Sequence, residues 1–86
     1  MKTLKVTLKN DTGLHARPAS QLVECVQKFE SKIELEKEGN IYNPGSMMSI
    51  LSMGAGKGTE LIFTIEGSDE DSAYDALKEL IEKEIE

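Results

Sequence analysis

The 86-residue sequence predicts an α+β fold, an open-faced β-sandwich in which three helices cover one face of a four-stranded antiparallel sheet. Short segments alternate apolar and polar residues, the period of half-buried strands, and other segments have helical spacing. Turn-forming residues separate them, giving the order β-α-β-β-α-β-α. Four short strands are most simply arranged as one antiparallel sheet. A chain of this length is expected to form one domain over residues 1–86.

The first predicted strand and helix are joined by a turn. Residues 4–8 alternate apolar and polar side chains, and residues 10–13 tolerate unusual backbone angles. From Arg17 the apolar residues adopt helical spacing. Pro18 suits a first helical turn, where its missing N–H removes no hydrogen bond. We expect this helix to reach about Lys28.

The middle of the chain predicts a hairpin followed by a short helix. Residues 32–37 and 40–43 are the strands of the hairpin. Ser46 is a suitable N-cap for a helix over residues 47–53. Residues 54–58 are expected to be a flexible connection, because the GK[ST] step and glycine spacing of a phosphate-binding loop are absent.

The last strand and helix follow the same rules. Residues 61–65 alternate as a strand, which Gly67 ends. Ser68 or Asp69 is expected to cap the final helix. The apolar stripe of this helix consists of Ala73, Ala76, Leu77, Leu80 and Ile81.

The charge distribution excludes one class of function. Residues 1–68 are neutral overall, and residues 69–86 supply the whole net charge of −6. A nucleic-acid-binding protein needs a basic stripe, which is absent, so no nucleic-acid partner is expected. The acidic segment is interpreted as the solvated face of the last helix.

Several further features indicate a cytoplasmic protein. The single cysteine, Cys25, cannot form an internal disulfide and is expected to be a packing residue. Neither a secretion signal nor a membrane-spanning segment is recognisable, so membrane insertion is not expected. No cluster of side chains has metal-ligand spacing, and we expect neither a metal nor a cofactor. A small acidic domain of this kind is expected to be a monomer.

The densest group of chemically capable residues is Gly13-Leu14-His15-Ala16-Arg17-Pro18. The only histidine precedes a helix start, where unpaired backbone N–H groups and the helix dipole favour an anion. Arg17 is placed to add a charge-assisted hydrogen bond to a phosphate. Ala16 and Pro18 belong to the same helix start. A capping or surface histidine is the alternative interpretation.

This hexapeptide resembles the active-site signature of HPr, the histidine-containing phosphocarrier family of the bacterial sugar phosphotransferase system. The resemblance extends to length, element order, Ser46 and the loop over residues 54–58. It implies that enzyme I, charged by phosphoenolpyruvate, phosphorylates Nδ1 of His15, and that EIIA components of sugar permeases receive the group. Arg17 would steady the charge during transfer. Such a carrier is not an enzyme in isolation, although it forms a phosphohistidine intermediate.

The resemblance also implies a regulatory site. In Gram-positive members the serine matching Ser46 is phosphorylated by an ATP-dependent HPr kinase, which enables a transcriptional co-repressor role. The flanking residues Pro44, Gly45 and Ser49 depart from the family pattern. The alternative function is therefore a regulatory HPr-like interaction protein that acts through Ser46, although such relatives typically lack the histidine.

A partner-binding patch is implied at four positions, which are Ser20, Met47, Met48 and Leu51. The last three share a helix surface, and methionine suits surfaces that accept several partners. Ile50 and Met53 are expected in the core. Glu24 and Gln27 stand where some relatives carry lysine, a difference expected to act mainly on association rates.

Overall fold

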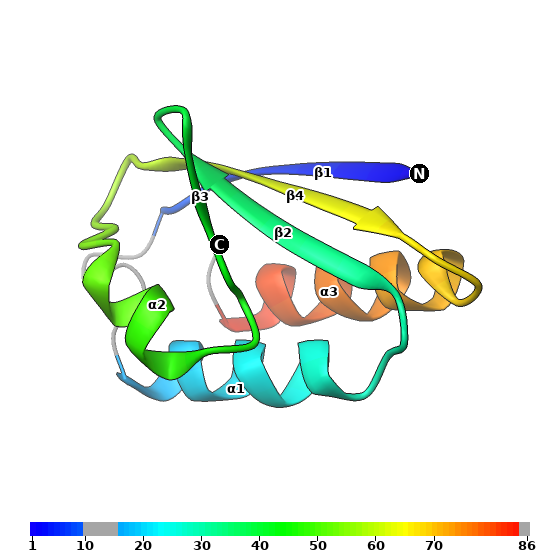
Figure 1. Cartoon of the computed structure of the whole chain (residues 1–86). Coiled ribbons are helices and arrows are strands. Elements are labelled where there is room, and N and C mark those ends of the chain that lie inside the picture. Colours follow the sequence, from blue (N-terminus) through cyan, green and yellow to red (C-terminus); the bar gives the residue numbers. More distant parts are fainter. Residues whose placement is uncertain (10–15, 85–86) are drawn as a thin grey trace.

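The computed structural model of the chain describes residues 1–9 and 16–84, and only the backbone of Glu84. It confirms the predicted element order within these residues. The elements are β1 (Lys2–Thr7), α1 (Ala16–Gln27), β2 (Lys32–Lys37), β3 (Asn40–Tyr42), α2 (Met47–Ser52), β4 (Glu60–Glu66) and α3 (Glu70–Glu84). The molecule has two layers, with a twisted sheet above and the helices below (Figure 1).

The described strands form one antiparallel sheet in the order β1-β4-β2-β3. The last strand in sequence therefore lies between the first two. Phe63 at the centre of β4 is paired with Leu4 of β1 on one side and with Leu35 of β2 on the other. All three are buried. This row of large apolar side chains forms the middle of the inner sheet face.

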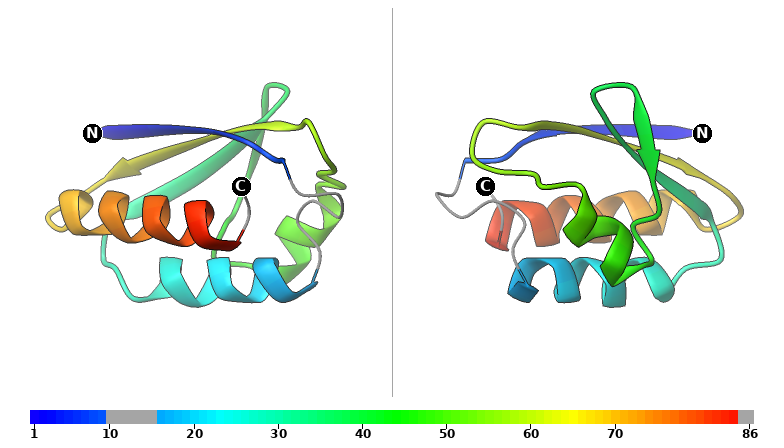
Figure 2. Two further views of the ribbon diagram at one scale, coloured as in Figure 1. Left: turned by 180° about the vertical axis from the view of Figure 1, so that it is seen from behind. Right: turned by 60° about the vertical axis from the view of Figure 1, so that its left-hand side comes forward.

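The helices cover only the inner face of the sheet, as predicted (Figure 2). α1 and α3 pack against each other, and α2 packs against α1. Helical spacing directs one stripe of each helix to the sheet. The core consists of Leu4, Val6, Leu8, Ala19, Leu22, Val23, Ile33, Leu35, Ile50, Met53, Ala55, Leu61, Phe63, Ile65, Ala73, Leu77 and Ile81.

The start of α3 is tied to the loop after α1. Asp69 precedes α3 as expected, but its carboxylate accepts hydrogen bonds from the N–H groups of Glu30 and Ser31, both 2.9 Å long, and from the Ser31 hydroxyl. Gly67 lies so close to this loop that a Cβ there would be 2.6 Å from the Cα of Ser31. The hydrogen bonds of Asp69 thus connect the start of α3 to Ser31 and Glu30, which precede Asp69 by 38 and 39 positions in the sequence.

The loop before β4 makes long-range contacts that the sequence does not suggest. Residues 54–58 connect α2 to β4, as expected, and the end of the loop is hydrogen-bonded to Leu8. The Gly58 N–H donates to the Leu8 carbonyl at 2.7 Å, and the Leu8 N–H donates to the Thr59 carbonyl at 2.9 Å. Ala55 is buried in the core. These bonds extend the β1–β4 pairing by one step, which local composition could not reveal.

Among the residues that the structure describes, none of the helices has the length and apolar character of a membrane span.

Candidate functional site

The first turn of α1 is the described part of the hexapeptide. His15 lies outside the described residues. Ala16 begins the helix, Arg17 is exposed, and Pro18 is buried against the core. The first N–H groups of a helix have no intrahelical partners, and no acidic side chain of α1 lies in its first turn to offset their positive charge. The turn can therefore accept an anion beside an exposed guanidinium.

α2 is capped by Ser46, as predicted. The residue has extended backbone angles, and its hydroxyl accepts a hydrogen bond from the Ser49 N–H at 3.3 Å. The Ile50 N–H donates to the Ser46 carbonyl at 3.1 Å and begins the helical pattern. Ser46 is half-buried. Its hydroxyl thus already has a structural role at the start of α2.

The turn before α2 is built from Asn43, Pro44 and Gly45. The Gly45 N–H donates to Oδ1 of Asn43 at 2.9 Å, and the Ser46 N–H donates to the Asn43 carbonyl at 3.1 Å. A Cβ at position 45 would lie 3.3 Å from that same Oδ1, which is a tight contact. Pro44 is fully buried. Gly45 and Pro44 therefore form one local structure with Asn43.

The four positions of the implied partner patch have different environments. Ser20 is exposed on α1. Met48 and Leu51 are 81% and 48% exposed, whereas Met47 is partly buried and packs against the core. Ile50 and Met53 are buried, as predicted. The start of α1 and the end of α2 lie at the same end of the molecule in all views (Figures 1 and 2).

Two features beside α2 were not found from the sequence. The Lys37 ammonium, at the end of β2, donates to the Met53 carbonyl at 2.7 Å, and Met53 is the C-cap of α2. A cation at this end of a helix is favoured by the dipole. Ile41 on β3 is 58% exposed. A long-range bond such as that of Lys37 has no sequence signal, since the two residues are 16 positions apart.

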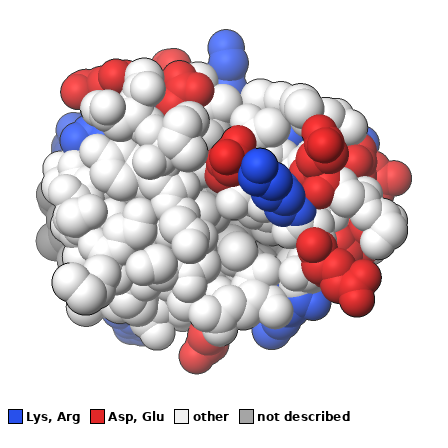
Figure 3. Space-filling view, viewed as in Figure 1, with Lys and Arg blue, Asp and Glu red and all other residues white. Residues whose placement is uncertain are grey.

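The surface over α2 is uncharged. Figure 3 shows this broad area on the left of the molecule, whereas charged side chains gather toward the right and the upper edge. The sequence contains the corresponding signal, because no residue from 39 to 56 is charged.

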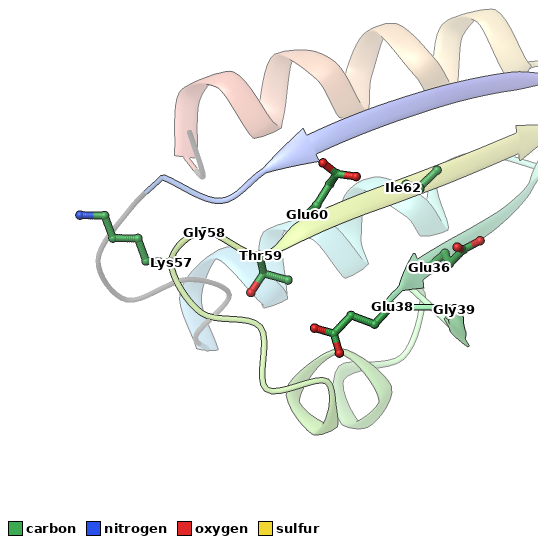
Figure 4. A pocket seen from close by; sticks show the side chains of 8 residues that line it. All are labelled: Glu36, Glu38, Gly39, Lys57, Gly58, Thr59, Glu60 and Ile62. Carbon is green, nitrogen blue, oxygen red and sulfur yellow. The ribbon is translucent and has the colours of Figure 1, made fainter.

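Charged side chains gather instead at an open groove of about 500 Å³ on the sheet (Figure 4). Glu36, Glu38 and Glu60 line it, but their carboxylates are well separated and Lys57 extends away from them. In the described part of the chain, no three His, Cys, Asp or Glu side chains form a group that could hold a metal ion. The groove therefore offers no convergent set of catalytic groups.

Cys25 packs partly buried against the core, as expected for a small packing residue. Burial raises the pKa of its thiol, which disfavours the reactive thiolate. Cys25 therefore adds no nucleophile to the site.

Comparison with known proteins identifies the family. A family model described as the PTS HPr component phosphorylation site matches residues 2–83. The chain belongs to the HPr family. It thus has the fold of the HPr phosphocarriers of the phosphotransferase system, and the family match supports a phosphocarrier role that uses phosphohistidine.

Solved HPr structures agree with this assignment. The chain is 43% identical to HPr from Thermoanaerobacter tengcongensis, with a TM-score of 0.90 and coverage of 96% of this chain and 93% of that one. It is 32% identical to the histidine-containing phosphocarrier protein of Mycoplasma, with a TM-score of 0.91 and coverage of 95% and 93%.

A third similar structure is Crh, the catabolite repression HPr of Bacillus subtilis. It is 35% identical and has a TM-score of 0.73, and the match covers 99% of this chain and all of that chain. The HPr fold is therefore shared with a protein named for regulation, so the fold alone does not distinguish the two functions that the sequence leaves open.

Proposed function

We propose that this HPr-family protein accepts a phosphoryl group on His15 from phosphorylated enzyme I and passes it to EIIA components. The observation that carries the proposal is the start of α1. Ala16, the residue bonded to His15, begins the helix, and consecutive Cα atoms are about 3.8 Å apart. What supports the proposal is that the chain neighbour of His15 starts a helix whose first turn offers unpaired N–H groups and the exposed Arg17.

The chemistry requires a neutral imidazole and a compensated phosphoryl charge. The Nδ1 lone pair of His15 attacks phosphorus as the bond to the donor breaks, and Nε2 keeps its proton. The three phosphoryl oxygens carry the charge during transfer. The Arg17 guanidinium and the first-turn N–H groups of α1 supply positive charge to them. Transfer to EIIA runs the same step in the opposite direction.

The test is labelling by enzyme I and radiolabelled phosphoenolpyruvate. The wild-type protein is expected to acquire an acid-labile label, and His15→Ala is expected to acquire none. Arg17→Gln should lower the transfer rate by about 10²-fold, since it removes one charged group from the transition state. Glu82→Gln, on exposed α3 surface, serves as the control with wild-type labelling. Undiminished labelling of His15→Ala would refute the proposal.

A second candidate function is regulation through Ser46, with an HPr kinase as modifying partner and a transcriptional regulator as reader. The similarity to Crh favours this candidate. Phosphorylation would replace the hydroxyl that accepts the Ser49 N–H with a dianionic group at the edge of the uncharged surface. The charge would disfavour docking of partners that bind beside it.

Labelling by ATP and an HPr kinase tests this candidate. Ser46→Ala should lose the label, whereas Ser52→Ala, which changes an exposed serine of the same helix, should keep it. Equal labelling of both variants would exclude Ser46 as the site.

A further inference from the structure

The two edge strands of the described sheet, β1 and β3, differ in length. β3 has three residues, whereas β1 has six and pairs, within the described residues, only with β4. Figure 2 shows β1 along the outer margin of the sheet, with α3 beneath it. An edge strand presents unpaired backbone groups to any other extended chain. The free edge of β1 is therefore a place where a further strand can be added.

The register determines which backbone groups of β1 are free. The Leu8 N–H donates to the Thr59 carbonyl at 2.9 Å, so the backbone of residue 8 faces β4. In an antiparallel pair the backbone groups of successive residues point alternately to the two sides of a strand. The even-numbered residues of β1 therefore bond to β4, and the N–H and carbonyl groups of the odd-numbered residues point to the free edge. These residues, whose side chains are exposed, are Thr3, Lys5 and Thr7.

Lys5 lies at the centre of this free edge. Residues 1–9 contain three lysines and no acidic residue, although the whole chain has a net charge of −6. The Lys5 side chain is exposed and forms no ion pair with another residue that the structure describes. A lysine on an edge strand disfavours the addition of strands that cannot compensate its charge. Lys5 thus selects for a strand that has a carboxylate opposite it.

A small hollow lies between the free edge and α3. Its volume is about 110 Å³, whereas pockets for small-molecule ligands have roughly 300 Å³ or more, so it suits a side chain. Leu4, Val6 and Ile81 give it apolar surface, and the charges of Lys78 and Glu82 on its rim offset each other. Side chains alternate between the two faces of a strand. The residues beside the acidic one in an added strand therefore face this hollow and are best apolar.

From these observations we propose that the free edge of β1 binds an extended segment of a partner protein in which an acidic residue lies between two apolar, β-branched residues. The backbone of this segment exchanges hydrogen bonds with the odd-numbered residues of β1, and its carboxylate pairs with Lys5. One of its apolar side chains enters the hollow beside Ile81. The site goes beyond the proposed function, because it uses no residue at the start of α1 or on α2.

A second copy of the chain is a poorer occupant of this edge. When two β1 strands pair antiparallel about their centres, the lysines at position 5 lie directly opposite each other. Like charges in that position destabilise a strand pair, whereas opposite charges stabilise it. The charge of β1 therefore favours a different chain that supplies a carboxylate.

The test is an NMR titration of the full, isotope-labelled protein with the acetylated and amidated peptide Thr-Val-Glu-Val-Thr. At saturation the amides of Thr3, Lys5 and Thr7 should exchange with solvent several-fold more slowly, because they gain hydrogen bonds. The amides of Leu4 and Val6 should change less, since they are already bonded to β4. The peptide Thr-Val-Lys-Val-Thr should bind about fivefold more weakly, because it places a like charge opposite Lys5.

A charge reversal on β1 provides the matched variants. Lys5→Glu should reverse the preference, so that the lysine peptide binds about fivefold more tightly than the glutamate peptide. Lys9→Glu makes the same change of charge beyond the end of β1 and should keep the wild-type preference. Both side chains are exposed, so neither change disturbs the core.

Three results would overturn the proposal. The first is unchanged exchange of the three free-edge amides at about 1 mM peptide, a concentration that detects even weak binding. The second is the same peptide preference in Lys5→Glu as in Lys9→Glu, which would place the peptide elsewhere. The third is sedimentation of the peptide-free protein as a dimer with these amides already protected, which would assign the edge to a second copy of the chain.

Discussion

The two sides of this small domain use charge in opposite ways. On the side of α3, charged groups make the contacts that hold chain segments together: Asp69 binds the loop after α1, Glu70 binds the N-terminal ammonium at 2.9 Å, and Asp71 binds Lys2 at 3.0 Å. On the side of α2, residues 39–56 have no charge at all. The segment is held instead by neutral hydrogen bonds and by the single ammonium of Lys37.

This difference separates stability from recognition. Exposed apolar side chains gather where charges are missing, and the helix that follows His15 begins at the same end of the molecule (Figure 1). Substitutions on the α3 side should therefore change unfolding and leave phosphoryl transfer by the folded protein unchanged. Substitutions of the exposed apolar residues Met48 and Leu51 on the α2 side should do the opposite.

The largest effect on the α3 side is expected for Gly67→Ala. The new Cβ would lie 2.6 Å from the Cα and hydroxyl of Ser31, so the loop after α1 has to move. We expect a loss of about 3 kcal/mol in the free energy of unfolding, measured in urea. Gly56→Ala is the control, because a Cβ at Gly56 meets nothing within 4 Å. Equal stability of the two variants would contradict the close packing of Gly67 on Ser31.

The contact that Gly67→Ala disrupts also shows the limit of prediction from sequence. Alternation and helical spacing identified the strands and helices, because these patterns are local and the core of a small domain needs one apolar face per element. The strand order, with β4 between β1 and β2, depends on pairing between distant segments. The carboxylate of Asp69 was expected at a helix cap, and nothing local indicates that it reaches Glu30 and Ser31.

In the candidate site, too, local features were predicted from the sequence and tertiary contacts were not. The N-cap at Ser46 and the burial of Ile50 and Met53 follow from local spacing and were predicted correctly. The partial burial of Met47 beside the exposed Met48 depends on how α2 is rotated against the core, which spacing alone does not determine. The bond from Lys37 to the end of α2 is a tertiary contact and was missed for that reason.

The next largest effect concerns pH and Asp69. Its hydrogen bonds from the Ser31 hydroxyl and the Glu30 N–H hold the pKa of the carboxyl below its ordinary value of 3.8. A carboxyl with a lowered pKa in the folded state stabilises the protein above about pH 4, and this contribution is lost as the pH falls through the folded-state value.

Urea unfolding between about pH 7 and pH 2.5 measures this contribution. Wild type should lose stability on acidification, and Asp69→Asn should start lower and depend less on pH. Glu70, whose pKa the N-terminal ammonium and the Gly67 N–H also lower, retains part of the acid dependence in that variant. A pH profile of Asp69→Asn that parallels wild type would contradict the role of the Asp69 carboxylate.

A smaller effect, on the α2 side, is expected for Lys37→Met. The substitution keeps much of the side-chain length and removes the charged donor to the Met53 carbonyl. We expect a loss of about 1 kcal/mol in the free energy of unfolding. Because that bond holds the end of α2, the amides of α2 should exchange with solvent faster while those of α3 do not change. Lys37→Arg can donate to the same carbonyl and should largely restore protection, whereas equal exchange in the Met and Arg variants would argue against the bond.

The smallest effect is expected for Lys2→Gln. The Lys2 ammonium lies 3.0 Å from an Asp71 carboxylate that is 81% exposed, and 5.6 Å from the centre of the Tyr74 ring. Water and salt screen such an exposed pair, so Tm should fall only slightly and the difference from wild type should vanish in about 1 M NaCl. A large, salt-resistant decrease would show that exposed ion pairs carry much of the stability on the α3 side. A small, screened decrease instead assigns that stability to the hydrogen bonds of the Asp69 carboxylate with the backbone of Glu30 and Ser31 and to the close packing at Gly67.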